Sequence, residues 1–330
     1  MPSPLPPCLT KKVLRMKERC YIGIDSGGSH CKGVLVTESG RCLGTSEAGP
    51  CSVTGTPFDT ACENLKTVIL ALISLCNEDQ EISGLFAGIS GCGVAEDAAR
   101  FDAFLHQEFP ELPSAKTGSD ALNPLYACIG DQDGIIAICG TGSGAYARIR
   151  GDMHRVDLDG YLFGDEAGGF AIGRHVINSA LRMQDGRMKK TLLYDLCAAK
   201  MNGDVRAHLQ TAYAGGKQYV ATFAPVAFEA MMSGDEIGKS IIDQAVDSIT
   251  EDILAASVHF PSETERITVV ACGSLWKPAD RYFEKAVTRR IGPGFEIRTP
   301  DLDPAFGAAV YAAALTGLEN TEKMLENIQK

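Results

Sequence analysis

The chain has 330 residues, with 31 lysines and arginines against 42 aspartates and glutamates, so its formal net charge is −11. Hydrophobic residues make up 45% and charged residues 22%, which is typical of a globular enzyme and excludes disorder of the whole chain. No stretch approaches the about 18 consecutive apolar residues of a membrane span. The acidic balance also argues against a nucleic-acid or membrane surface. One hydrophobic core rarely serves a chain of this length, so we expect two domains.

The 12 cysteines form no C-x-x-C pair and show no zinc-ligand spacing with histidine. Most lie inside apolar runs, as Cys139 and Cys272 do, where a free cysteine acts as a small hydrophobic residue. Reduced thiols favour a cytoplasmic location. Residues 1–20 lack the apolar core of a signal peptide, and we predict a flexible tail there.

In the first half of the chain, a glycine turn joins two short apolar runs. The run from Tyr21 leads into Gly27-Gly28-Ser29, and the run around Val34–Val36 leads out, which predicts a β-hairpin. Residues 59–76 place their apolar side chains at helical spacing and predict an amphipathic helix. Gly, Ser, Asn and Pro then cluster over residues 118–124, where we expect a hinge.

The second half begins with the same plan. Residues 134–149 again read as strand, glycine turn and strand, and residues 235–258 have the spacing of a long helix. A strand over residues 267–271 ends in Gly273-Ser274, and residues 304–315 predict a helix of small residues. Because helices and strands alternate throughout, the predicted class is α/β, with two related halves.

The glycine turns are the first candidates for chemistry. Successive backbone N–H groups in such a turn can cradle phosphate oxygens, and glycine allows close approach and positive φ. Ser29 and Thr141 add hydroxyl groups to the two turns, and Asp25 precedes the first turn as a ligand suited to Mg²⁺. Each turn alone is better explained by an ordinary hairpin. The occurrence of two favours a phosphate clamp.

Other nucleotide-binding and catalytic motifs are missing. Residues 233–240 end like a Walker A loop, but Ser233 stands where its first glycine is required. No G-x-G-x-x-G motif stands at a strand-to-helix turn. The G-x-S-x-G elbow, the H-E-x-x-H motif and the protein-kinase catalytic loop are also absent, which argues against dehydrogenases, serine hydrolases and metalloproteases.

Three acids are candidate site residues. Asp120 follows a Gly-Ser pair and precedes an apolar helix start, so it could cap that helix or act as a general base in a cleft. Asp165 and Glu166 are adjacent and flanked by glycines. They could bind a polar ligand or form a solvated face.

Eight segments together resemble the N-acetylglucosamine kinase and BadF/BadG/BcrA/BcrD ATPase family, within the wider sugar kinase, actin and heat-shock ATPase fold. They occur in family order from residue 21 to about residue 315: IDSGGSHCKGVLV, FAGISGCG, TGSDALNPLYA, ICGTGSGAYARI, GYLFGDEAGGFAIGRHVI, FAPVAFEAMMSGD, VVACGSLWKP and PAFGAAVYAAA. Each motif alone is degenerate, whereas their order is specific.

The resemblance implies an α/β fold of two ribonuclease-H-like (actin-like ATPase) domains around a central cleft. The expected domains are residues 21–120 and 121–315, with a C-terminal helix at about 316–330 packing back on the first. The implied activity is an ATP- and Mg²⁺-dependent kinase that phosphorylates the 6-hydroxyl of N-acetyl-D-glucosamine. Its partners would be ATP and an amino sugar, without nucleic acid or membrane, and the family favours a homodimer.

The same resemblance assigns roles to residues. Asp120 matches the catalytic base and Asp25 the Mg²⁺-associated acid, acting through water. The positions matching ATP-binding loops are Gly27, Gly28, Ser29, Gly140, Thr141, Gly142, Gly273 and Ser274. The positions matching the sugar site are Thr54, Ser90, Gly91, Asp120, Ser143, Gly144, Asp165 and Glu166.

Departures from the family pattern leave alternatives open. Asp159 stands where relatives often have tryptophan, and Thr54 where animal relatives have a sugar-contacting asparagine, so the sugar could be glucosamine. A non-catalytic sugar sensor or regulatory ATPase of the same fold is the more distant alternative. Some family members hold an iron–sulfur cluster, but this chain has no paired cysteines for one.

Overall fold

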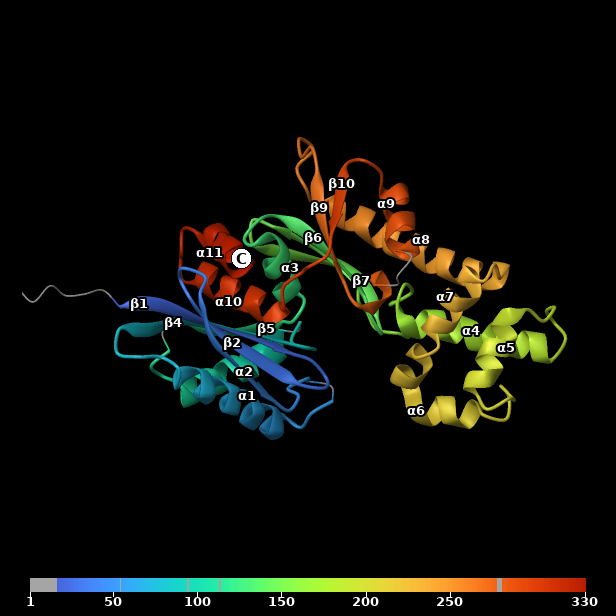
Figure 1. Ribbon diagram of the computed structural model, residues 1–330, viewed down its shortest axis with the longest axis horizontal. Helices are drawn as coiled ribbons and strands as arrows, with labels where there is room; N and C mark the ends of the chain where they lie inside the picture. The colour runs from blue at the N-terminus through green and yellow to red at the C-terminus, as the bar shows by residue number, and fades with distance from the viewer. Residues whose placement is uncertain (1–16, 54, 94, 113, 278–280) are drawn as a thin grey trace, which may run out of the picture. The chain divides into compact units, whose positions relative to one another are not determined.

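The computed structural model describes residues 17–53, 55–93, 95–112, 114–277 and 281–330 (Figure 1). The chain forms two compact units. Unit 1 contains the residues up to Ser119 together with Ala308–Lys330, and unit 2 contains Asp120–Gly307. No helix among the described residues is long and apolar enough to cross a membrane.

Unit 1 is built on a five-stranded sheet in the order β3-β2-β1-β4-β5. The first three strands are antiparallel neighbours, whereas β1, β4 and β5 are parallel. The strands are β1 (Glu18–Ser26), β2 (Cys31–Thr37), β3 (Cys42–Ala48), β4 (Gln80–Ile89) and β5 (Ala115–Ser119). The helices are α1 (Phe58–Ile73), α2 (Ala95–Glu108), α10 (Pro304–Leu315) and α11 (Thr321–Ile328).

Apolar side chains at helical spacing bind α1 to the sheet of unit 1. Leu65, Val68 and Leu72 are fully buried and belong to one core with residues of β1, β4 and α2. On the opposite face of the sheet, Phe86 of β4 meets Tyr311 of α10 edge to face, with ring centroids 4.5 Å apart. Helices therefore cover both faces of this sheet, as parallel strands require.

Unit 2 repeats this topology in the order β10-β9-β6-β7-β8, again with an antiparallel meander beside two parallel strands. Its strands are β6 (Gly134–Cys139), β7 (Ser143–Ile149), β8 (Asp152–Asp157), β9 (Ile267–Cys272) and β10 (Phe295–Arg298). Its helices are α3 (Leu122–Ile129), α4 (Gly169–Gln184), α5 (Leu192–Lys200), α6 (Leu209–Ala221), α7 (Ala224–Met232), α8 (Glu236–Ser257) and α9 (Tyr282–Ile291), with a short 3₁₀ turn at Ser274–Trp276.

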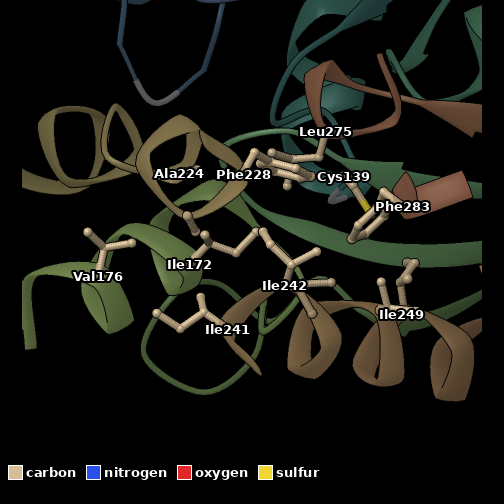
Figure 2. Packing of buried hydrophobic residues seen from close by; sticks show 14 of the residues in the cluster. Cys139, Ile172, Val176, Ala224, Phe228, Ile241, Ile242, Ile249, Leu275 and Phe283 are labelled. Atoms are coloured by element: carbon tan, nitrogen blue, oxygen red, sulfur yellow. The ribbon is translucent and has the colours of Figure 1, made fainter. Parts of the chain in front are cut away.

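Helices α4 to α7 form an insertion between β8 and α8 that has no counterpart in the described part of unit 1. Figure 2 shows side chains from α4, α7, α8 and α9 meeting in the core of unit 2, among them Ile172, Phe228 and Ile242.

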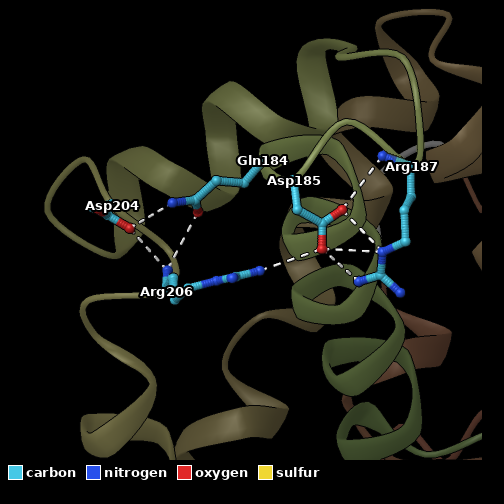
Figure 3. A network of polar contacts seen from close by, with 5 residues as sticks. All are labelled: Gln184, Asp185, Arg187, Asp204 and Arg206. Carbon is cyan, nitrogen blue, oxygen red and sulfur yellow. Dashed lines mark hydrogen bonds and ion pairs between the residues drawn. The ribbon is translucent and has the colours of Figure 1, made fainter.

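Polar contacts stabilise the C-terminal end of α4. Asp185 accepts hydrogen bonds from Arg187 and Arg206, which lowers the pKa of its carboxyl to about 2, mainly through Arg187 (Figure 3).

Most of the elements predicted from the sequence are confirmed. Both hairpins, the strand ending before Gly273 and the helices predicted at residues 59–76, 235–258 and 304–315 are present. The prediction of a flexible tail over residues 1–20 is wrong for the last residues of this range, because β1 begins at Glu18 and Cys20 is fully buried. Residues 1–16 lie outside the described part. The contacts of residues 308–315 place them in unit 1, not in the predicted second domain.

Candidate functional site

Two glycine turns of unit 2 lie side by side because the strands before them are parallel neighbours. Ile138 of β6 pairs with Cys272 of β9, so both chains leave the sheet at the same edge. Gly273 has a φ of +110° and packs against the backbone of Cys139 and Gly140, where a side chain would not fit. In open α/β sheets, ligands bind outside the carboxyl ends of the strands.

A pocket of about 650 Å³ opens at this edge and is lined by Gly140 and Thr141 of one turn and Ser274 of the other. Its opposite wall comes from α6 and α7 and includes Gln218, Phe228 and Met232. Its size is within the range of small-molecule sites, and it combines backbone and hydroxyl donors with an apolar wall. The structure thus brings three of the predicted ATP-binding residues together in one pocket.

The turn at Gly140–Ser143 is fixed to the start of α4. Gly169 N donates to Gly140 O at 2.8 Å, and Phe170 N donates to Thr141 O at 3.0 Å. These bonds satisfy N–H groups at the helix start that have no partner within the helix. Thr141 Oγ1 also donates to Gln218 Oε1 at 3.2 Å. The turn is therefore held in place before any ligand binds.

Asp165 lies directly behind this turn and is almost completely buried. Its carboxylate accepts a hydrogen bond from Ser143 N at 3.2 Å and forms an ion pair with Lys217 Nζ at 2.8 Å. Ser143 Oγ in turn accepts a hydrogen bond from Ala167 N at 2.9 Å. A Cβ added to Gly142 would lie 2.5 Å from Asp165 Oδ2. Three of the predicted site residues, Gly142, Ser143 and Asp165, therefore form one packed group.

The loop that carries Asp165 is strained. Asp157, Leu158 and Asp165 have φ values of +56°, +65° and +61°, in the left-handed region that non-glycine residues rarely adopt. Both carboxylate oxygens of Asp157 accept a hydrogen bond from Asp165 N at 3.0 Å. Such strain persists only where surrounding contacts enforce it, and it concentrates at functional sites. Asp157 supplies that contact here.

A second acid lies near the loop on α8. Asp252 has a buried oxygen, Oδ2, without a hydrogen-bond partner among the described residues. Burial, followed by repulsion from Asp157, Glu251 and Glu166, raises the pKa of Asp252 to about 7. This part of unit 2 therefore concentrates negative charge, and Lys217 offsets it at Asp165.

Two more of the predicted sugar-site residues lie in this region, one at the surface and one packed closely against a loop. Glu166 is exposed, in contrast to its buried neighbour Asp165. Gly144 has a φ of +145°, and a Cβ there would lie 2.9 Å from Leu158 N. Close packing against the 157–165 loop thus explains this glycine.

Unit 1 groups another set of predicted residues at the carboxyl edge of its parallel strands. Ser90 N donates to Ser26 O at 2.8 Å and Val53 N donates to Ser90 O at 3.1 Å, which joins the ends of β1 and β4 to the segment before residue 54. Gly91 has a φ of +91° and packs beside Val53. Thr54, which was predicted to contact the sugar, lies outside the described residues.

The first glycine turn is open. A Cβ at Gly27 or Gly28 would meet no atom within 4 Å, and Ser29 is exposed with its hydroxyl 2.9 Å from His30 Nδ1. Ser26 is fully buried, and its Oγ accepts a hydrogen bond from Cys51 N at 3.1 Å. The free space above the turn fits a ligand that approaches the backbone.

Asp25 is half-buried at the end of β1 beside this turn. No group of three or more His, Cys, Asp or Glu side chains that could hold a metal ion exists in the described part of the chain. A single carboxylate beside an open glycine turn fits Mg²⁺, because this ion keeps several waters and takes other ligands from substrate phosphates.

Asp120 directly follows β5, which ends at Ser119. Asp120 lies directly before Ala121, the N-cap residue of helix α3. Its backbone oxygen accepts a hydrogen bond from Asn123 N at 3.1 Å.

Three residues that orient the predicted groups were not found from the sequence: Asp157, Lys217 and Gln218. Lys217 and Gln218 belong to α6, more than fifty residues from the groups they contact, and no local motif marks them. Asp157 could have been suspected, because it precedes the glycine-rich loop that carries Asp165.

Comparison with known proteins agrees with this geometry. The chain is 25% identical over 301 residues to an N-acetylmuramic acid/N-acetylglucosamine kinase from Clostridium acetobutylicum (88% of this chain, 97% of that protein). It is 24% identical over 299 residues to a glucosamine kinase from Vibrio cholerae (88% of this chain, 95% of that protein). The structure of a proposed N-acetylglucosamine kinase from Chromobacterium violaceum matches with a TM-score of 0.67 at 23% identity, covering 90% of this chain and 99% of that one.

The structural likeness confirms the predicted fold class, an α/β fold of two ribonuclease-H-like domains. The model of the BadF/BadG/BcrA/BcrD ATPase family matches residues 22–312, which is most of the chain, and the protein therefore belongs to this family.

Proposed function

We propose that this protein is an ATP-dependent sugar kinase that transfers the γ-phosphoryl group of ATP to the 6-hydroxyl of N-acetyl-D-glucosamine. The observation that carries the proposal is the pocket in unit 2, where the turn at Gly140–Thr141 meets the loop at Ser274. The names of the Clostridium and Vibrio relatives support a hexosamine as the acceptor.

In this proposal, Ser274 and the apolar wall from α7 hold the adenosine, and the backbone N–H groups at Gly140–Gly142 bind phosphate oxygens. Gly27, Gly28 and Ser29 form the second set of phosphate donors in unit 1. When bound at Asp25, Mg²⁺ would neutralise charge on the β- and γ-phosphates.

In this proposal, Asp165 accepts hydrogen bonds from sugar hydroxyls, and Lys217 holds its carboxylate in place through their ion pair at 2.8 Å. Ser143, Gly144 and Glu166, with Ser90, Gly91 and Thr54 of unit 1, complete the proposed sugar site.

Asp120 is the proposed general base. As the sugar O6 attacks the γ-phosphorus, its proton passes to the Asp120 carboxylate, the bond from the γ-phosphorus to the bridging oxygen breaks, and ADP leaves. Base catalysis of this kind contributes roughly 10²–10⁴-fold. Positioning and charge stabilisation contribute most of the remaining acceleration.

Glucosamine is the second candidate acceptor because of the Vibrio relative. An ammonium group would favour a free carboxylate in the site. Asp159 carries a half-exposed carboxylate that forms an ion pair with Arg155 at 2.6 Å.

An ADP-release assay with N-acetylglucosamine, glucosamine and glucose tests the proposal. We expect the highest kcat/KM with N-acetylglucosamine, and NMR of the product should place the phosphate on O6. A higher kcat/KM with glucosamine would establish the alternative. If none of these sugars stimulates ADP release, the protein is not a hexosamine kinase.

A further inference from the structure

A second pocket of unit 2 lies between α4 and α6 and shares no lining residue with the proposed nucleotide pocket. Its volume is about 470 Å³, which is sufficient for a small organic molecule. The lining residues of each helix recur at helical spacing, so two facing stripes form the walls. They are Phe170, Arg174, Ile177, Asn178 and Leu181 of α4, and Leu209, Ala212, Tyr213, Gly216, Lys217 and Val220 of α6, with Tyr161 at one end.

The pocket exists because α6 is interrupted. Gly216 has φ +58° and ψ −153° inside the helix, which breaks the regular packing of α6 along α4. Tyr213, one turn before the break, leaves 79% of its surface exposed. Two facing helices with apolar stripes would normally close on each other, whereas here an open space remains between them.

The walls of the pocket are aromatic. Tyr161 and Phe170 meet edge to face with ring centroids 4.8 Å apart, and Lys217 Nζ lies 5.7 Å from the centroid of the Tyr161 ring. Such walls bind a flat ring or an apolar chain by dispersion and by removing its surface from water.

Positively charged side chains line the pocket, although the net charge of the protein is −11. Two cations, Arg174 and Lys217, line it, and no carboxylate does. Within the described part of the chain, Arg174 forms no hydrogen bond or ion pair with another side chain. An unpaired guanidinium beside an apolar cavity favours a carboxylate, which it can bind through two parallel hydrogen bonds.

We propose that the pocket between α4 and α6 binds a small organic acid, with its apolar or ring-shaped body between Tyr161, Phe170 and Tyr213 and its carboxylate on Arg174 and Lys217. Lys217 also holds Asp165 at 2.8 Å. The bound carboxylate and Asp165 therefore share one cation, and binding in this pocket is coupled to the group that contains Ser143 and Gly142.

The test uses 2-naphthoate as the probe and its neutral analogue, 2-naphthamide, as the control. Both are titrated calorimetrically into the full chain without ATP or sugar, so the result does not depend on the proposed kinase activity. We expect 2-naphthoate to bind and 2-naphthamide to bind about tenfold more weakly, because only the acid forms charge-assisted hydrogen bonds. Equal affinity for the two, or no binding of either, would overturn the proposal.

Variants locate the binding site. Arg174→Gln should weaken 2-naphthoate binding about tenfold, whereas Arg182→Gln, on the same helix but outside the pocket, should leave it unchanged. Equal effects of the two substitutions would contradict the proposal.

Asp165→Asn releases Lys217 from its partner and should tighten 2-naphthoate binding severalfold, provided that thermal unfolding shows a folded protein. An unchanged affinity in a folded Asp165→Asn variant would contradict the proposal that the bound carboxylate and Asp165 share Lys217.

A second copy of the chain is another conceivable occupant of this face. In that case, the affinity for 2-naphthoate would fall as the protein concentration rises, because the copies would compete with the probe. The proposal predicts an affinity that is independent of protein concentration, and a marked dependence would overturn it.

Discussion

The two units share one strand order, but their glycine turns are built differently. In unit 1, the turn at Gly27–Ser29 is open, and a side chain at Gly28 would meet nothing within 4 Å. In unit 2, the turn at Gly140–Ser143 is hydrogen-bonded to α4 and packed against Asp165. The same local pattern thus serves two purposes. Glycine leaves open space at the first turn, which the proposed function assigns to phosphate, and it leaves room for the protein itself in the second.

The difference between the turns arises from the insertion of α4 to α7. This insertion supplies the helix start that fixes the second turn and the lysine that neutralises Asp165. Between β3 and β4, the described residues of unit 1 form a single helix, α1.

The largest effect on stability should come from exchanging glycine for alanine in each turn. Gly142→Ala places a methyl group against the Asp165 carboxylate and should lower the free energy of unfolding by about 1–3 kcal/mol, because the buried ion pair must shift. Gly28→Ala should change it by less than about 0.5 kcal/mol but raise the KM for ATP. Urea unfolding and ATP kinetics check both variants, and equal destabilisation would contradict the contrast between the turns.

A somewhat smaller effect is expected at Asp157, which supports the left-handed backbone of Asp165. Asp157→Ala should lower the free energy of unfolding by about 1–2 kcal/mol. It should also raise the KM for the sugar more than the KM for ATP, because Asp165 loses the contact that holds it in position. Asp159→Ala is the matched control. Its ion pair with Arg155 is half-exposed on both sides and contributes little. If the two variants have the same sugar KM, Asp157 has no positioning role.

A pH-dependent effect is expected at Asp252. The pKa of this carboxyl is about 7 in the folded chain, above its ordinary value, so the folded state holds one more proton between pH 4 and pH 7. The free energy of unfolding therefore falls as the pH rises through this range. Asp252→Asn should raise the free energy of unfolding by about 1 kcal/mol at pH 8 and by less at pH 5. The gain at pH 8 is smaller than the full pKa shift would give, because the carboxyl is partly solvated. A gain that is equal at both pH values would contradict the assignment.

The elements and the glycine turns could be predicted because each rests on local spacing. The helix face of Leu65, Val68 and Leu72 and the two hairpins follow from patterns within about twenty residues. The strand at Glu18–Cys20 was not predicted, because its charged start resembles a solvated tail.

The candidate site was predictable only in part. Gly140, Thr141 and Ser274 stand in recognisable motifs, and the structure brings them into one pocket. Lys217 could not be assigned to Asp165, because their contact depends on how α6 packs on α4. Gly28 and Gly142 do not adopt the positive φ that glycine allows, and the nearby Asp165 carboxylate explains the missing side chain at Gly142.

The most direct test of the proposed kinase is the turnover of Asp120→Asn with ATP and N-acetylglucosamine. Asparagine keeps the size of the side chain but cannot accept the proton, so kcat should fall by about 10²–10⁴-fold while thermal unfolding and sugar binding remain close to those of the unaltered chain. A turnover near that of the unaltered protein would contradict Asp120 as the general base and, with it, the proposed mechanism.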